Sequence, residues 1–200
     1  MSLLALTSIL LFFSMAFTTI NARIVLPPPV VDTDGNPVQF GSGYHLVPFW
    51  VDTGGGLALG PNSNHDKTCP LSVVQLSLNA KKGLPIHFYV PVAPAEINSN
   101  YVLTSIDLIL QFNSSSICGK NPTWKLDEFD ESVGKYFIST TNAVTRSMKL
   151  EFKIERLGSS SSVNRYKLSH CPTVCSIVCH SFARTLGCTG MLRMEFGVWL

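Results

Sequence analysis

The sequence lacks a charge excess of either sign, and it lacks long apolar runs after its first residues. Its 15 lysines and arginines balance 13 aspartates and glutamates, so the formal net charge is only +2 at pH 7. Proteins that bind nucleic acids present clustered positive charge to the phosphates, so nucleic acid is not expected as a partner. Beyond residues 1–22, charged residues, glycines and prolines interrupt every apolar run before the ~20 residues that a membrane-spanning helix needs. No membrane partner is predicted.

The sequence also lacks motifs that assemble catalytic groups. Histidine, serine and aspartate all occur, but none stands in a nucleophile elbow or a comparable motif. The glycine run Gly54–Gly56 is too short and too bare of lysine and serine to cradle a phosphate, and it predicts a connection between strands. We therefore predict that the protein is not an enzyme and needs no cofactor.

Short runs of β-branched, aromatic and other apolar residues recur along the chain, with turn residues between them. They include residues 44–51, 71–76, 86–90, 108–112, 123–126, 148–154 and 166–168. Within residues 149–155, polar and apolar side chains alternate as they do in a strand with one face in water. Many short strands at close spacing are typical of a β-sandwich or barrel, and a chain of 200 residues suits one all-β domain.

Residues 1–22 have the pattern of a secretory signal peptide. An apolar run from Leu3 to Phe17 is followed by small polar residues and then by Ala22, which suits the last position before cleavage. The mature domain is therefore expected to span residues 23–200 and to be secreted to the extracellular space. One N-glycosylation sequon, with Asn113 as its acceptor, supports this route.

Six cysteines in a secreted chain predict disulfides, because oxidising compartments let such bonds persist. They are Cys69, Cys118, Cys171, Cys175, Cys179 and Cys188, and counting alone cannot assign their pairing. His170 and His180 flank the last group at intervals that could enclose zinc. Thiols are normally oxidised after secretion, so disulfides are favoured and no metal is predicted.

Several motifs share their order and spacing with one known family. They are Val30–Val38, Tyr44–Leu46, Gly54–Leu57, Cys69–Gln75, Lys82–Pro85, Pro122–Leu126 and Tyr166–Leu168 followed by Cys171-Pro172. Over residues 24–180 the chain resembles the plant Kunitz (soybean trypsin inhibitor) family, and within it the miraculin-like branch.

The resemblance implies a β-trefoil, which is a six-stranded barrel capped by hairpins, and a bond between Cys69 and Cys118. The other four cysteines would pair either as Cys171–Cys188 with Cys175–Cys179 or as Cys171–Cys175 with Cys179–Cys188. The family continues for two strands after its last cysteine, whereas here only residues 189–200 remain. We therefore expect the barrel to lack a regular final strand and to leave an exposed edge.

The resemblance also implies a monomeric serine protease inhibitor, secreted to the apoplast or delivered to the vacuole, that presents one exposed loop as a substrate mimic. This loop should lie between Tyr89 and Asp107, and no lysine or arginine occurs from Gly83 to Gly119, so an acidic S1 pocket finds no counter-charge there. Subtilisin-like enzymes and serine carboxypeptidases are accordingly kept as targets. Phe40 stands where the family has an asparagine that braces the loop.

Two registers of this loop are open. One places Ala93 at P1, between Val92 and Pro94, and the other places Leu103 at P1, followed by Thr104. An alternative reactive site for basic-specific proteases is Arg184 with Thr185, because Arg184 lies between cysteines that could hold it extended. The competing hypothesis is a storage or recognition β-trefoil that binds another protein or a carbohydrate and inhibits nothing.

Overall fold

The computed structural model describes residues 25–49, 54–62, 68–77, 82–91, 99–132, 134–142, 147–158, 164–170 and 194–199. These ranges hold short strands: β1 (His45–Pro48), β2 (Leu57–Gly60), β3 (Ser72–Gln75), β4 (Ile86–Tyr89), β5 (Ile109–Phe112), β6 (Ser115–Ser116), β7 (Gly119–Lys120), β8 (Thr123–Asp130), β9 (Lys135–Thr141), β10 (Lys153–Arg156), β11 (Tyr166–Ser169) and β12 (Met194–Trp199). The one helix in these ranges is the 3₁₀ turn η1 (Met148–Leu150). No helix in the described part is long and apolar enough to cross a membrane.

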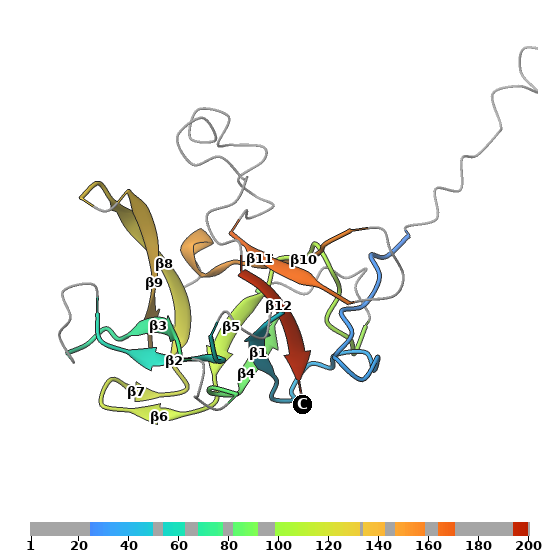
Figure 1. Ribbon diagram of the computed structural model, residues 1–200, viewed down its shortest axis with the longest axis horizontal. Coiled ribbons are helices and arrows are strands. Elements are labelled where there is room, and N and C mark those ends of the chain that lie inside the picture. Colours follow the sequence, from blue (N-terminus) through green and yellow to red (C-terminus); the bar gives the residue numbers. More distant parts are fainter. Residues whose placement is uncertain are drawn as a thin grey trace, which may run out of the picture.

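All strand pairs are antiparallel and form two larger sheets and one ribbon. The sheets have the orders β1-β12-β11-β10 and β2-β3-β9-β8-β5-β4, and the ribbon is β6-β7. Two isolated bridges join the larger sheets: Tyr44 with Ile86, beside β1 and β4, and Leu108 with Phe152, beside β5 and β10. Strands β1, β4, β5 and β12 lie at the centre of the molecule, and the β8–β9 hairpin reaches away from them (Figure 1).

The prediction that a regular final strand would be missing is wrong. Strand β12 lies between β1 and β11, with His45 opposite Trp199 and Leu168 opposite Met194. The last residues include methionine, phenylalanine, valine and tryptophan, and β-branched and aromatic residues favour strands. Six residues are enough to pair with the four of β1, so the short tail still covers that edge.

The core is built by alternation along these short strands. Ile86 and Phe88 of β4 are fully buried, whereas Tyr89 is exposed. Trp124 fills the centre, with its ring 5.2 Å from Phe112 and 6.2 Å from Phe152, measured between centroids. Each such side chain contributes roughly 1.5–3 kcal/mol through burial, so these positions carry much of the fold's stability.

The alternation predicted for residues 149–155 is confirmed for its apolar members. Leu150, Phe152 and Ile154 are all buried. Glu151 is also buried, at 2% exposure, so of the polar positions in this segment Lys149 is exposed whereas Glu151 is not.

Two glycine-containing motifs that are distant in sequence meet in space. A Cβ on Gly56 would lie 1.8 Å from the carbonyl oxygen of Lys82, and a Cβ on Gly83, whose φ is +85°, would lie 2.3 Å from the carbonyl oxygen of Leu57. The backbone N–H of Leu84 donates to that same Leu57 carbonyl at 2.7 Å. Only glycine permits this approach, which sets the position of the chain just before β4.

Candidate functional site

A tight N-terminal hairpin is held by the buried carboxylate of Asp32. Its Oδ1 accepts the backbone N–H groups of Asp34 at 2.9 Å and Asn36 at 2.8 Å. The backbone N–H of Asp32 donates to the carbonyl of Asn36 at 2.9 Å, and Val31 bridges Pro37. Aspartate commonly stabilises turns by bonding backbone groups two or more residues ahead. The hairpin therefore presents two fixed arms, one on each side of its turn.

Both segments of the hairpin form backbone hydrogen bonds with Val102. Val30 donates its N–H to the carbonyl of Val102, Val102 donates to Val38, and Val38 donates to Val30, each at 2.8 Å. The three valines form a closed ring of backbone hydrogen bonds, and all three are fully buried. Residue 102 is thereby fixed between two segments that are far from it in sequence.

Further hydrogen bonds hold the chain just before and just after Val102. Phe40 donates its backbone N–H to the carbonyl of Asn100 at 3.0 Å. Thr104 donates both its backbone N–H and its hydroxyl to the carbonyl of Pro28, at 2.9 and 3.0 Å. Phe40 thus braces this stretch through its main chain while its ring packs against the core.

Two buried tyrosines anchor the hairpin to the barrel, and sequence reasoning missed both. The hydroxyl of Tyr44 accepts the backbone N–H of Gln39 at 2.9 Å, and the hydroxyl of Tyr166 accepts that of Val31 at 2.9 Å. Both tyrosines open motifs singled out above, and a buried tyrosine normally finds a partner for its hydroxyl. From the sequence, this rule indicates that each hydroxyl has a hydrogen-bond partner, but it does not identify the partner.

The chain enters the candidate loop from β4 and returns at Ser99. β4 is held by β5 on one side and by the bridge from Tyr44 to Ile86 on the other. Tyr89 and Tyr101 stand on either side of residues 92–98, and each is 41% exposed. Val92, Ala93 and Pro94 lie outside the described residues. Both ends of the connection that carries them are nevertheless fixed by the hydrogen bonds above.

The register that places Leu103 at P1 is wrong. Leu103 is only 4% exposed and bridges Pro29 of the N-terminal segment, and Thr104 is buried against Pro28. A P1 side chain has to be exposed to enter a protease pocket. Leu103 and Thr104 instead attach the chain after the candidate loop to the N-terminal segment.

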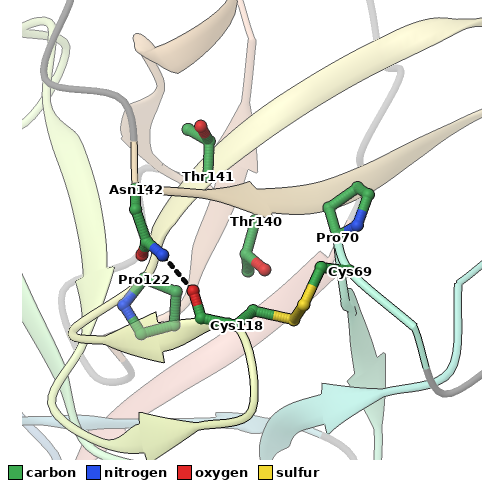
Figure 2. A pocket seen from close by; sticks show the side chains of 7 residues that line it. All are labelled: Cys69, Pro70, Cys118, Pro122, Thr140, Thr141 and Asn142. Atoms are coloured by element: carbon green, nitrogen blue, oxygen red, sulfur yellow. Dashed lines mark hydrogen bonds between the residues drawn. A yellow bond between two sulfur atoms is a disulfide. The ribbon is translucent and has the colours of Figure 1, made fainter.

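The disulfide between Cys69 and Cys118 is present, as predicted. It borders an open pocket of about 250 Å³ that is lined also by Pro70, Pro122, Thr140, Thr141 and Asn142 (Figure 2). The polar groups of this pocket are used internally. Thr140 donates its hydroxyl to Leu71 at 2.9 Å, and Asn142 donates its side-chain N–H to the carbonyl of Cys118. The arrangement ties the cysteine loops to β9.

His170 directly follows β11 and is the last residue of the described range 164–170. It lies edge-on to Phe152, with ring centroids 5.5 Å apart. Burial lowers its pKa from the usual 6.5, and a hydrogen bond to the backbone of Glu151 and the charge of Asp107 oppose this shift. Cys171, Cys175, Cys179, His180, Arg184, Thr185 and Cys188 lie outside the described residues, and so does the predicted signal peptide, residues 1–22.

Comparison with known proteins gives one consistent match. Residues 30–194 match the family described as Kunitz legume, trypsin and protease inhibitor. Miraculin from Synsepalum dulcificum is 34% identical over 86% of this chain and 81% of its own length. The latex serine proteinase inhibitor of Carica papaya is 36% identical over 74% of this chain and 78% of its own length.

The fold has close counterparts among solved structures. The structure of soybean trypsin inhibitor in complex with porcine pancreatic trypsin superposes with a TM-score of 0.55 and 23% identity, over 73% of this chain and 80% of that chain. This likeness concerns the fold, and it confirms the predicted β-trefoil.

Proposed function

This chain belongs to the Kunitz legume family of trypsin and protease inhibitors, and we propose that it inhibits a serine protease through the connection at residues 92–98. The observation that carries the proposal is the ring formed by Val30, Val38 and Val102, which fixes the chain where it leaves this connection. A loop with fixed ends loses little conformational entropy on docking, and its two ends stay close together after cleavage. This is the property that a substrate-like inhibitor requires.

The chemistry of the loop favours a protease with an apolar or small S1 pocket. Residues 92–98 contain valine, alanine, proline, glutamate, isoleucine and asparagine, and no basic residue occurs between Gly83 and Gly119. We assign P1 to Ala93, with Val92 before it and Pro94 after it. Subtilisin-like and elastase-like enzymes and serine carboxypeptidases fit this chemistry better than trypsin, whose acidic pocket requires lysine or arginine.

Tyr89 and Tyr101 supply further contacts in this proposal. Both are partly exposed, and they flank the two ends of the loop. Tyrosine is enriched at protein interfaces because its ring buries a large apolar area while its hydroxyl remains able to bond. We propose that both rings contact the rim of the protease, and that the inhibitor acts as a secreted monomer without catalytic activity of its own.

A protease panel tests the proposal. The purified protein is titrated against trypsin, chymotrypsin, elastase, subtilisin, a serine carboxypeptidase and papain. We expect stoichiometric inhibition of at least one enzyme with an apolar or small S1 pocket and weaker inhibition of trypsin. Tyr89→Ala and Tyr101→Ala should each weaken binding, whereas Phe129→Ala, which removes an exposed ring on the β8–β9 hairpin, should not.

Two other results of the panel have defined meanings. Inhibition of trypsin alone would move the reactive site to Arg184 and Thr185, the remaining basic candidate between cysteines. No inhibition of any enzyme would contradict the proposal and favour a storage or recognition role.

A further inference from the structure

Asn113 occupies a rigid, outward-facing bend directly after β5. Its backbone N–H donates to the carbonyl of Pro85 at 2.8 Å. The residues around it are fixed in the same way, because Phe112 donates to Pro122 at 3.0 Å and Asn121 donates to Ser114 at 2.7 Å. The main chain of the bend is therefore held from three sides.

The two side chains that define the sequon are free within the described part of the chain. Asn113 and Ser115 are both exposed, and neither the carboxamide nor the hydroxyl has a hydrogen-bond partner there. Asn142 provides a contrast, because its carboxamide is bonded to the Cys118 carbonyl and it is not followed by a sequon. The one sequon of the chain thus coincides with an available asparagine.

We propose that Asn113 is an N-glycosylation site, and that its glycan lies at the end of the β4–β5 pair opposite the protease-binding loop. In the transfer, Nδ2 of Asn113 forms a bond to C1 of the first sugar. The bond from C1 to the diphosphate of a lipid-linked oligosaccharide breaks, and the amide proton leaves with the diphosphate. The proposal relies on the secretory route of the proposed function, and no redox change is involved.

The strand register determines which end of the β4–β5 pair carries Asn113. β4 and β5 are antiparallel, with Ile86 opposite Phe112 and Tyr89 opposite Ile109. Asn113 follows Phe112 at the end where β4 begins, whereas residues 92–98 follow the end where β4 finishes. At about 3.4 Å per residue, the paired strands separate these two ends by roughly 10 Å.

The surface beside Asn113 suits a covering glycan. Ile117, at the tip of the β6–β7 ribbon, is 74% exposed, and it lies four positions beyond Asn113 in sequence. Ser115, which completes the sequon, is the first residue of this same ribbon. A glycan on Asn113 would therefore stand at the base of the ribbon and shield its apolar tip.

Mass spectrometry of the full chain expressed in plant leaf cells tests the site. We expect a glycan on the peptide that contains Asn113, and its enzymatic release should convert Asn113 to aspartate. Asn113→Gln and Ser115→Ala should both abolish it, whereas Ser115→Thr and the neighbouring Ser116→Ala should retain it. Recovery of the chain with unmodified Asn113, whether secreted or retained, would overturn the proposal.

Inhibition assays separately test the proposal that the glycan lies away from the protease-binding loop. Against any protease that the panel identifies, the glycosylated protein and its enzymatically deglycosylated form should have the same inhibition constant. Weaker inhibition by the glycosylated form would overturn the placement of the glycan away from the loop. If no protease is inhibited, the proposed function fails, but the mass of the Asn113 peptide still decides whether the site is glycosylated.

Discussion

Val102 donates its backbone N–H to the carbonyl oxygen of Val38 at 2.8 Å, which links the chain just after the candidate loop to the N-terminal hairpin. Together with Val30, these residues close a ring of hydrogen bonds inside the core. The N-terminal segment therefore supports the loop, although several strands lie between the two in the sequence.

The first prediction concerns the packing of this ring. Val102→Ala should lower the free energy of unfolding by about 2 kcal/mol, because a fully buried side chain loses two methyl groups and leaves a cavity. It should also weaken protease inhibition, since the support of the loop loosens. Chemical denaturation and inhibition assays measure the two effects. Val25→Ala, at a position that is 87% exposed, is the matched control and should change neither.

The second prediction follows from the buried position of Leu103. Leu103→Ala should cost about 2–5 kcal/mol of stability, as expected for a leucine in a packed core. Leu103→Arg should destabilise the protein further and should not create trypsin binding. Denaturation together with a trypsin titration checks both points. A stable Leu103→Arg variant that inhibits trypsin would show that Leu103 reaches a protease after all.

The third prediction tests the register of the loop. Ala93→Arg should raise the affinity of the protein for trypsin, because a basic P1 side chain can pair with the acid of the S1 pocket. Ala95→Arg adds the same charge two positions away and should have a much smaller effect. Inhibition constants for trypsin measure the difference. Equal gains for the two variants would mean that charge, and not position, governs binding.

The fourth prediction is a pH dependence that arises from His170. Burial lowers its pKa below 6.5 in the folded protein, so the unfolded chain binds the proton first as the pH falls. Stability should therefore decline as the pH drops from about 6.5 toward the folded pKa, and it should be fully present above that window. Thermal melts from about pH 7 to about pH 5 give the slope.

The control for this pH effect is a comparison of slopes. His170→Gln removes the titrating group, so its melting temperature should depend less on pH over this range than that of the unmodified protein. Val25→Ala, which changes no titratable group, should keep the original slope. If the slope is the same in His170→Gln, another group causes the decline.

Sequence reasoning succeeded where local patterns or short motifs determine the structure. The alternation at Leu150, Phe152 and Ile154 belongs to this class. The Cys69–Cys118 bond was implied by the family resemblance and is present. The fold followed from many such motifs in a shared order. Each motif predicts only the local structure around it, whereas the order of the motifs along the chain indicates the family and with it the barrel.

It failed where a residue's environment depends on a distant segment. Leu103 follows the candidate loop closely in sequence, yet it is buried and pairs with Pro29 of the N-terminal segment. The hydroxyls of Tyr44 and Tyr166 find partners in that same hairpin, which no local pattern indicates. The prediction that the final strand is missing rested on the few residues that follow Cys188 by comparison with the family, whereas β12 needs only to match the short strand β1.

Mapping the bond that a bound protease slowly cleaves is the most direct test of the central claim that residues 92–98 contact the enzyme. The inhibitor is incubated with a protease that it inhibits, and the nicked product is identified by peptide mass and N-terminal sequence. We expect one cleavage within residues 92–98, with the two fragments still associated in native buffer. Stoichiometric inhibition with cleavage after Arg184, or at any bond outside this connection, would contradict the account.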